Sequence, residues 1–523
     1  MSVTVREAVF GLLRDFGLTT IFGNPGSTEL PMYRDFPADF RYVLGLQESV
    51  VVAMADGFAQ ARGTAALVNL HSAAGVGHAV GSLFTAYRNQ SPLVITAGQQ
   101  ARSILPFEPF LYSAEATNLP RPYVKWSCEP ARAEDVPAAI ARAIFTALQP
   151  PRGPTFVSIP VDDWDRPCTP TPMREVSSRV AGDPTLLSRA AAMLSAAQRP
   201  VLVAGASVAR DQAWDDLIAL AERHKVPVWV SPLSSRNSFP ERHPLFAGFL
   251  PADRAQIVAL LAGHDLIVVL GAPVFTYHVE GHGPYLPDGA ALVQLTDDPA
   301  AAARAPAGLS IVTDLKLGVR ALLAAPAPAR AAPAVPPRAG ALPPDRLSDR
   351  YLLQQLAALR PPDSIVVEEA PSSRGAMHDY LPMLAPDSFY TCASGGLGHG
   401  LPAAVGVALG RPGRRVIALL GDGSAMYSIQ GLWSAAELAL PVTFVIVNNG
   451  GYRALDEFGA HFGLTALPGT LLPHLDFCEL ARAQGVEGVR ASRCAELDTA
   501  LSTALAASGP VLVEVCVEQA SSK

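Results

Sequence analysis

The sequence has few charged residues, no basic block and no long apolar run. Charged residues make up 17% of the 523 positions, hydrophobic residues make up 49%, and the formal net charge is −7. Chains that bind nucleic acid carry clustered lysine and arginine, so we expect no nucleic-acid partner. A membrane helix needs about 18 continuous apolar residues, and no segment reaches that length, so we expect no membrane span and a cytoplasmic protein.

Cysteines are also few and widely spaced. The chain has six of them, and no two form a Cys-x-x-Cys pair. Zinc ribbons and disulfide frameworks need closely spaced cysteines, so the sequence excludes both and predicts reduced thiols.

Composition divides the chain into blocks. The stretch "AAPAPARAAPAVPPRAGALPPD" (residues 324–345) is rich in proline and alanine, which is typical of an extended linker. A weaker break lies at residues 166–185. The sequence therefore predicts three domains, at residues 1–165, 183–323 and 346–523, which is a usual number for this length.

Each block alternates short apolar runs with longer amphipathic stretches. Examples are "TAALVNLHS" and "SPLVITAGQ" in the first block, and "RRVIALLGDG" and "PVTFVIVNNG" in the last. Such runs, divided by helical segments, are typical of parallel strands that are buried on both faces. The sequence predicts an α/β protein in which each domain is a parallel sheet covered by helices.

Polar motifs follow two predicted strands of the last block. The strand at 416–420 runs into Gly-Asp-Gly, and the strand at 442–447 runs into Asn-Asn-Gly, with a helix expected over 429–440. Parallel strands end at one edge of a sheet, where α/β folds bind ligands. We expect Asp422 and Asn449 to share Mg²⁺ or Ca²⁺ with a backbone carbonyl, phosphate oxygens and water. An aspartate that merely caps a helix is the alternative, and the paired asparagines argue against it.

Gly-Asp-Gly followed by Asn-Asn at this spacing resembles the motif of thiamine-diphosphate enzymes. Several segments, in chain order, are similar to the 2-keto acid decarboxylases of that family, and among them to the benzoylformate decarboxylase group. They include "FGNPGSTELP", "NLHSAAGVGHA" and "GGLGHGLPAAVGVAL". The resemblance implies a pyrimidine-binding first domain, a nucleotide-binding-like middle domain and a diphosphate-binding last domain.

The same resemblance implies the cofactors. They would be thiamine diphosphate and Mg²⁺, for which Ca²⁺ could substitute. FAD, which some synthases of the family bind, is not expected, because "VLVAGASVARD" lacks a complete Gly-x-Gly-x-x-Gly.

The resemblance also assigns catalytic roles to four residues. Glu48 matches the glutamate that hydrogen-bonds the cofactor pyrimidine, and a helix-start glutamate favoured by the macrodipole is the alternative. His71 and His278 match a pair of proton-relaying histidines, although a lone histidine at a strand end is usually structural. Ser27 matches a serine that contacts the substrate carboxylate, and it could instead cap a helix. Because His278 comes from the middle block, the site would lie between domains.

The other expected site residues surround the cofactor and the substrate. Leu397 would wedge between the cofactor rings, unless it only packs in the core, and the Gly395 carbonyl would accept from the aminopyrimidine. The residues expected to bind the cofactor are Glu48, Gly395, Leu397, Gly421, Gly423, Ser424, Asn449 and Tyr452. The expected metal ligands are Asp422, Asn449 and the carbonyl of Gly451. The expected substrate pocket comprises Phe110, Leu111, Thr391, Ala454, Leu455 and Phe458. His264, His282 and His399 match no catalytic position and are expected to be structural.

The resemblance weakens in the substrate pocket. Thr391 stands where benzoylformate decarboxylases carry phenylalanine, and Phe110 stands where they carry leucine. Such exchanges can alter substrate choice by roughly 1–3 kcal/mol per contact. The remaining pocket residues are apolar, which still favours an aryl or bulky 2-keto acid.

The implied reaction is non-oxidative decarboxylation of such an acid to an aldehyde and carbon dioxide, through a thiamine-bound enamine. A carboligase or synthase of the acetohydroxyacid synthase type is one alternative, and a non-catalytic protein with the cofactor fold is another. The two histidines favour protonation of the enamine, and hence a decarboxylase. The resemblance further implies a homo-oligomer, a tetramer built from dimers with shared active sites.

Overall fold

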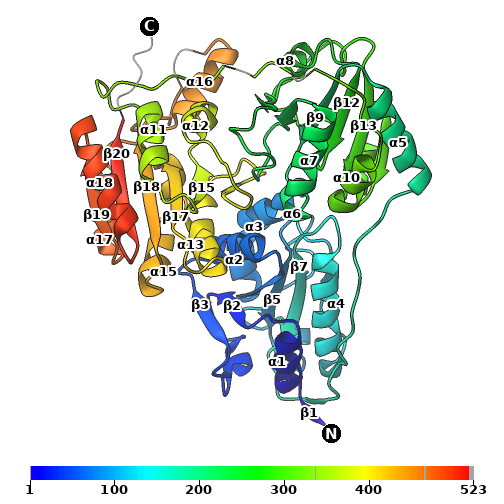
Figure 1. Ribbon diagram of the computed structural model, residues 1–523. Helices are drawn as coiled ribbons and strands as arrows, with labels where there is room; N and C mark the ends of the chain where they lie inside the picture. The colour runs from blue at the N-terminus through cyan, green and yellow to red at the C-terminus, as the bar shows by residue number, and fades with distance from the viewer. Residues whose placement is uncertain (1, 332, 336, 465–466, 518–523) are drawn as a thin grey trace. The chain divides into compact units, whose positions relative to one another are not determined.

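The computed structural model describes residues 2–331, 333–335, 337–464 and 467–517. The chain forms two compact units, which are described separately. The first unit comprises Met1–Ser177, Leu342–Gly375 and Ser394–Lys523, and the second comprises Ser178–Ala341 and Ala376–Ala393. Most of the first and last predicted domains therefore lies in one unit. The boundaries at residues 1–165, 183–323 and 346–523 remain predictions from the sequence. Three parallel sheets organise the chain (Figure 1).

The first sheet has the strand order β3-β2-β4-β5-β7-β6, and all of its pairs are parallel. Every residue of β4 and β5 is buried, as expected of strands with both faces covered. The strands are β2 (Thr20–Gly23), β3 (Arg41–Leu44), β4 (Ala66–Leu70), β5 (Leu93–Gln99), β6 (Ser127–Cys128) and β7 (Thr155–Pro160). The helices are α1 (Val5–Asp15), α2 (Glu48–Arg62), α3 (Ser72–Asn89) and α4 (Val136–Leu148). A short antiparallel pair joins β1 (Val3–Thr4) to β8 (Pro167–Cys168).

The second sheet lies in the second unit, in the order β11-β10-β9-β12-β13-β14. Alternate residues of β9 belong to different hydrophobic clusters, Leu202 to one and Val203 to the other, so both faces of this sheet are buried. The strands are β9 (Pro200–Ala204), β10 (Val228–Val230), β11 (Phe246–Phe249), β12 (Leu266–Leu270), β13 (Ala291–Thr296) and β14 (Leu309–Val312). The helices are α5 (Pro184–Ala196), α6 (Ser207–Arg210), α7 (Trp214–His224), α8 (Arg254–Leu260), α9 (Pro299–Ala303) and α10 (Leu315–Leu323).

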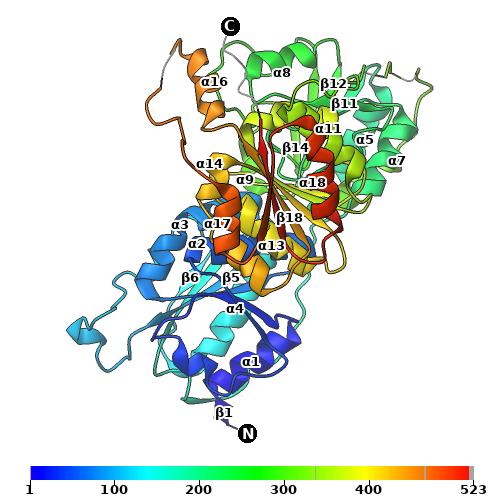
Figure 2. The same cartoon turned by 90° about the vertical axis from the view of Figure 1, so that its left-hand side faces the viewer.

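The third sheet contains the parallel run β15-β17-β18-β20-β19. Helices α17 and α18 pack against β19 and β20 (Figure 2), and α13 packs against β15 and β17. The strands are β15 (Ile365–Glu369), β17 (Val416–Gly421), β18 (Val442–Asn448), β19 (Glu487–Ala491) and β20 (Val511–Cys516). The helices are α11 (Asp349–Leu359), α13 (Gly400–Gly410), α14 (Asp422–Met426), α15 (Gly431–Glu437), α16 (Arg453–His461), α17 (Phe477–Ala483) and α18 (Cys494–Ala506). Between these segments, the chain also forms α12 (Arg374–Tyr380) and β16 (Phe389–Thr391).

Within the first unit, α2 and α13 pack closely against each other. A Cβ atom on Gly406 of α13 would lie 1.8 Å from the Met54 carbonyl oxygen of α2. A Cβ atom on Gly57 of α2 would lie 2.2 Å from the Ala403 carbonyl oxygen of α13. Glycine at both positions lets the backbones approach, so the helix that begins at Glu48 is fixed against the helix that follows Leu397.

These sheets confirm the predicted α/β class and the buried strands read from the apolar runs. The connection between β17 and β18 differs from the helix expected over 429–440. The observed helix α15 is shorter, because Ala439 adopts a left-handed backbone with φ of 48° that cannot continue it. Another short helix, α14, lies between β17 and α15.

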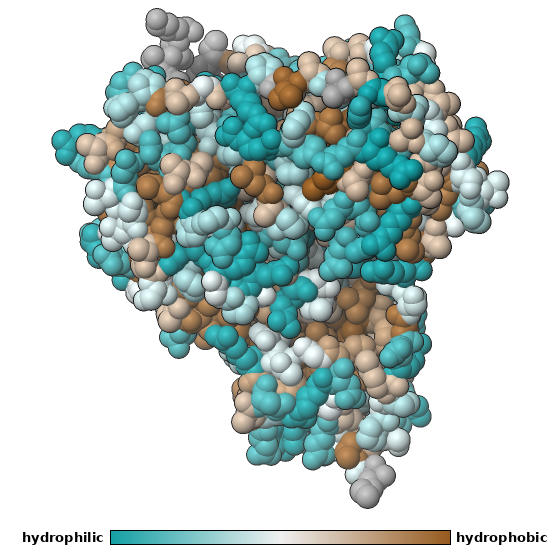
Figure 3. All heavy atoms as spheres, viewed as in Figure 1, coloured by the Kyte–Doolittle hydropathy of each residue, from teal (hydrophilic) through white to brown (hydrophobic). Residues whose placement is uncertain are grey.

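Other features of the sequence also have clear structural outcomes. All six cysteines are free thiols, and helices long and apolar enough to cross a bilayer are absent from the described part of the chain. On the face shown in Figure 3, hydrophobic side chains lie in small groups among hydrophilic ones. The described residues of the linker form neither helix nor strand. Arg330 anchors it by donating to the carbonyls of Leu194 and Ala197, both at 2.6 Å.

Candidate active site

The polar residues at the ends of β17 and β18 meet, as the sequence predicts. The two strands are neighbours, with Gly421 opposite Val447. The Asp422 side chain is 2% exposed, and its Oδ2 accepts from the Gly451 N–H at 2.9 Å. The same N–H also approaches Asn449 Oδ1 at 3.2 Å. The structure thus brings all three predicted metal ligands together.

The Asp422 carboxylate carries a charge that its protein partners do not neutralise. Its Oδ1 accepts from the Gly423 N–H at 2.7 Å, so its described partners are backbone N–H groups. Burial raises the pKa of the Asp422 carboxyl above its ordinary value, and the backbone donors oppose that shift. A buried carboxylate beside an amide oxygen is a fitting site for a hard divalent cation.

Glycine is required beside this carboxylate. A Cβ atom on Gly423 would lie 2.3 Å from the Tyr452 ring, so only glycine lets that ring lie against the start of α14. Gly421 is the residue before α14, and Ser424 is buried in its first turn. The predicted cofactor residues of this segment therefore gather around Asp422.

Glu48 is the first residue of α2 and is 8% exposed. The side chain of Gln47 caps this helix by accepting from the N–H groups of Ser49 and Val50. The Glu48 Oε1 accepts from Asn24 Nδ2 at 3.3 Å, and its Oε2 lies 3.0 Å from His78 Nδ1. The carboxylate is therefore held from two sides.

The sequence reasoning missed Asn24 and His78. A usable signal existed for His78, because it follows His71 by two helical turns on α3 and so shares its face. For Asn24 the signal was weaker, since it only precedes the "PGST" turn at the end of β2.

His71 lies at the N-terminus of α3, directly after β4. Its Nδ1 is 2.8 Å from Glu29 Oε2 and 3.1 Å from Thr28 Oγ1. A carboxylate can only accept, so Nδ1 is the donor and Nε2 is the ring nitrogen left for the site. Glycine at position 26 makes this possible, because a Cβ atom there would lie 2.1 Å from His71 Nδ1.

Glu29 was also missed. It is 2% exposed, and it accepts from the N–H groups of Gly26 at 3.0 Å and Gly98 at 2.9 Å, besides His71. Ser27 is exposed in the turn before it. The following short helix begins at Leu30 with Glu29 in the capping position, so Ser27 caps no helix.

The remaining histidines fall in several places. His278 belongs to the second unit, where its side chain is exposed. Its backbone N–H donates to the Ala252 carbonyl at 2.9 Å. The prediction that it shares a site with His71 stays a prediction. His264 Nδ1 lies 3.0 Å from the Arg199 carbonyl oxygen, and His282 is exposed. His399 is buried, with Nε2 at 2.9 Å from Asp56 Oδ2.

The residues expected around the cofactor rings lie before α13. Gly395 is exposed with a left-handed φ of 73°, which favours glycine, and Leu397 is half-buried. Leu397 is therefore not enclosed in a core of the described chain.

The predicted substrate-pocket residues come from three separate segments of the chain, and the pocket stays a prediction. Three of its members, Ala454, Leu455 and Phe458, lie on α16, where Leu455 is 52% exposed. Phe110 is 87% exposed in the loop after β5, and Leu111 beside it is half-buried. Thr391 ends β16 in the second unit, where it is buried.

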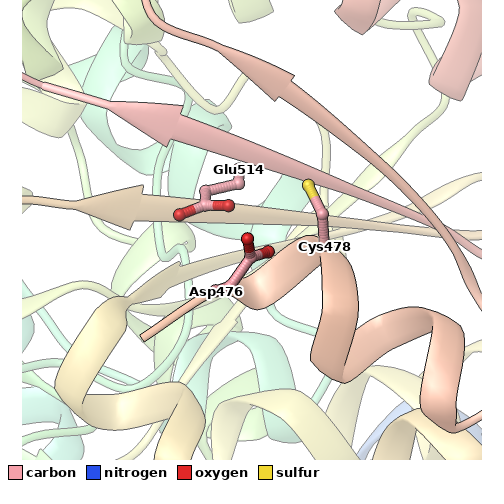
Figure 4. Close-up of side chains that lie close together, drawn as sticks. All are labelled: Asp476, Cys478 and Glu514. Carbon is pink, nitrogen blue, oxygen red and sulfur yellow. The ribbon is translucent and has the colours of Figure 1, made fainter. Parts of the chain in front are cut away.

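Asp476, Cys478 and Glu514 form a separate polar cluster, shown in Figure 4. Arg490 already supplies a positive charge there, at 2.7 Å from Asp476 and 2.9 Å from Glu514. Burial raises the pKa of the Cys478 thiol to about 11, so the sulfur stays protonated and is a poor metal ligand. This cluster is an ion-pair network between the start of α17 and the strands β19 and β20.

Three family models of the thiamine pyrophosphate enzymes match the chain. They are the N-terminal TPP binding domain at residues 3–115, the central domain at 187–322 and the C-terminal TPP binding domain at 371–515. Together they match more than half of the chain, so it belongs to the thiamine pyrophosphate enzyme family. Thiamine pyrophosphate is another name for thiamine diphosphate, and the resemblance read from the motifs is confirmed.

Relatives place the chain within that family. It is 49% identical over 519 residues to the benzoylformate decarboxylase of Pseudomonas aeruginosa, with 98% of each chain covered. The solved thiamine diphosphate-dependent 4-hydroxybenzoylformate decarboxylase of Rhodococcus jostii RHA1 matches with a TM-score of 0.96 and 44% identity, covering 99% of this chain and 100% of that one. The acetolactate synthase large subunit of Parasynechococcus marenigrum is more distant, at 27% identity over 99% of this chain and 88% of its own.

Proposed function

We propose that the protein decarboxylates an aryl 2-keto acid to an aldehyde and carbon dioxide with thiamine diphosphate. The observation that carries the proposal is the 49% identity, over nearly the full length, to a benzoylformate decarboxylase. The contacts of Glu48 and His71 support it, because neighbouring side chains hold both groups, and a carboxyl and an imidazole can each carry a proton.

When bound, thiamine diphosphate would supply a nucleophilic carbon for the keto group and an electron sink for the decarboxylation. Its diphosphate would be held at the start of α14 through Mg²⁺ or Ca²⁺, with Asp422, Asn449 and the Gly451 carbonyl as the protein ligands. Gly423 and Ser424 would lie beside the diphosphate, and the buried charge of Asp422 is the feature that supports a cation there.

The chain's own residues would then handle protons and position the acid. Glu48 shares a proton with the cofactor pyrimidine, while Asn24 and His78 keep its carboxyl in place. His71 exchanges a proton through Nε2, because Glu29 occupies Nδ1. His278 and Ser27 would complete the site, His278 as the second proton-transferring group and Ser27 as the donor to the substrate carboxylate.

An aryl substrate is favoured by apolar residues on α16. Leu455 and Phe458 come from that helix, and the Phe458 ring lies 5.4 Å from that of Phe462. Phe110 would form the opposite wall if a second copy of the chain covers it, since it is largely exposed in one chain. We therefore infer a homotetramer built from dimers with shared sites. We also infer that the protein acts in the cytoplasm.

A carboligase is the second candidate, because acetolactate synthases are distant relatives. The test is to incubate the protein with thiamine diphosphate, Mg²⁺ and a panel containing benzoylformate, 4-hydroxybenzoylformate and alkyl 2-keto acids, with and without an added acceptor aldehyde. We expect free aromatic aldehyde from the aryl acids. Formation of only a coupled hydroxyketone would favour the carboligase, and no product despite measured cofactor binding would overturn both.

A further inference from the structure

We propose that Glu369 is a positioning residue for the cofactor rings. It would act by fixing Ser394–Gly398, which we name the ring loop because it carries Gly395 and Leu397. The inference rests on the proposed function, since the ring contacts of those two residues belong to it. Glu369 itself is not placed against the cofactor.

Glu369 ends β15 and is 1% exposed. Its Oε1 accepts from the Gly398 N–H at 2.6 Å, and its Oε2 accepts from the N–H groups of His399 at 2.8 Å and Gly400 at 2.5 Å. These are the last residue of the ring loop, the N-cap residue of α13 and the first residue of that helix. A carboxylate suits this position, because unpaired N–H groups and the helix dipole make a helix start electropositive.

Tight packing leaves the loop end little freedom. A Cβ atom on Gly400 would lie 2.7 Å from the Glu369 Cβ, so the strand end and the helix start are in direct contact. Gly398 has a left-handed φ of 94°, and a Cβ atom there would lie 2.8 Å from the Tyr427 Cβ. The turn at Gly398 thus fits one backbone conformation, which Glu369 holds.

The other end of the ring loop has its own anchor. Ser394 Oγ lies 2.8 Å from Thr85 Oγ1 on α3 and accepts from the Gly396 N–H at 3.0 Å. Between the two anchors, Gly395 is exposed and Leu397 is half-buried. The loop therefore presents these residues outward from a backbone that is fixed at both ends.

Replacing Glu369 with glutamine should break one contact, the one with the Gly398 N–H. The amide nitrogen must face either the Gly398 N–H alone or the N–H groups of both His399 and Gly400, and all three are donors. Facing one donor costs less than facing two, so the amide turns toward Gly398. The substitution therefore releases the ring loop and leaves the helix start in place.

The neighbouring Glu368 offers a matched control. It is also fully buried on β15, but its carboxylate accepts from Arg374 at 2.8 Å and from the Ala370 N–H at 2.7 Å. Glu368→Gln removes a buried charge one residue away, and the described contacts of this side chain are to Arg374 and Ala370. Any effect common to both variants reflects the loss of a buried carboxylate.

The experiment compares the binding of thiamine diphosphate with that of inorganic diphosphate, both with Mg²⁺, by calorimetry on the full chain. For Glu369→Gln, titrated at pH 8 so that the wild-type carboxyl is charged, we expect Kd for thiamine diphosphate to rise by about tenfold or more, from the loss of one charge-assisted contact. Kd for inorganic diphosphate should stay within about twofold, because only the ring contacts change. Glu368→Gln should leave the ratio of the two constants unchanged.

Several outcomes would overturn the inference. It fails if Glu369→Gln weakens both ligands equally, or weakens neither. If that variant does not fold, Glu369→Asp keeps the charge on a shorter side chain, and an unchanged ratio in that variant counts against the inference. The proposed function is tested separately by the wild-type chain, since failure of that chain to bind thiamine diphosphate would remove both.

Discussion

The Glu29–His71 contact yields the sharpest test of the proton-transfer site. Glu29→Gln keeps the shape of the side chain and removes its charge. The four described donors to this carboxylate are the groups on Gly26, Thr28, His71 and Gly98. A glutamine offers only one acceptor oxygen, so two of the four donors must change their role.

The geometry limits where the loss falls. If the amide nitrogen faces Thr28 and Gly98, the Thr28 hydroxyl can rotate and accept, but the Gly98 N–H is orphaned. If it faces Gly26 and His71, the imidazole can accept only by moving its proton to Nε2, which reverses the orientation that the site requires. Either arrangement leaves one buried backbone N–H unpaired, which costs about 1–3 kcal/mol of stability.

The catalytic loss comes from the bond to His71. A hydrogen bond to a charged partner contributes about 1.5–3 kcal/mol, compared with 0.5–1.5 kcal/mol for a neutral one. If a neutral hydrogen bond replaces the charged one, the difference between these two energies is lost; if His71 adopts the other tautomer, the whole contribution of the bond is lost. At about 1.4 kcal/mol per factor of ten, these losses lower kcat/KM by roughly 10- to 100-fold. The affinity for thiamine diphosphate should not change, because Glu29 is not among the proposed cofactor contacts.

A double-mutant cycle separates this role from a general loss of structure. Steady-state decarboxylation is measured for Glu29→Gln, His71→Ala and the double variant. If Glu29 acts through His71, the second substitution adds little to the first. Additive losses, or a Glu29→Gln variant within twofold of wild type, would refute the reasoning.

The remaining predictions follow from burial and close approach. Asp422→Asn should abolish the stabilisation that thiamine diphosphate with Mg²⁺ gives in a thermal-shift assay, whereas the cofactor-free protein should lose only the pairing of one backbone N–H, about 1–3 kcal/mol. Gly423→Ala should weaken cofactor binding, measured by calorimetric titration, because the added Cβ atom would displace the Tyr452 ring. Burial, aided by the charge of Arg330, lowers the pKa of His224 to about 4 in the folded protein. As pH drops from about 6.5 toward 4, the unfolded chain therefore binds a proton at His224 that the folded chain does not bind, and the free energy of unfolding falls. Calorimetric unfolding at several pH values should show a weaker dependence of stability on pH in His224→Leu than in the wild type.

The parts of the site that the sequence could predict are those fixed by strand ends. Asp422 and Asn449 follow buried apolar runs, and adjacent parallel strands carry such residues to one edge. His71 was found in the same way, directly after β4. Apolar periodicity and turn chemistry are local properties, so a reading of the chain recovers them.

The supporting carboxylates could not be found in this manner. Glu29 contacts His71 across 42 positions, and Glu369 contacts Gly398 across 29. Nothing near either glutamate marks its partner, because the contact depends on how distant segments pack. The shortened α15 was missed for a related reason, since alanine at position 439 gives no signal of the left-handed turn it adopts.

Glu369 also separates the stability of the protein from the geometry of its site. Burial raises the pKa of this carboxyl to about 7, although the N–H groups of Gly398 and Gly400 and the imidazole of His399 favour the charged form. The folded chain then holds more protons than the unfolded chain between about pH 4.5 and 7, so the contribution of Glu369 to stability falls as pH rises through that range. His399, the N-cap residue of α13, is the titratable group that faces it and is itself paired with Asp56 of α2.

Glu369→Gln removes this proton uptake. The thermal midpoint of the wild type, measured by calorimetry, should therefore fall relative to that of the variant between pH 5 and pH 8, even though the variant binds thiamine diphosphate less well. Glu368→Gln, which loses an ion pair with Arg374, should show no such relative gain. Parallel midpoint curves for wild type and Glu369→Gln would mean that the carboxyl does not titrate in this range. Both results together would show that the charge of Glu369 serves the site at a cost to stability.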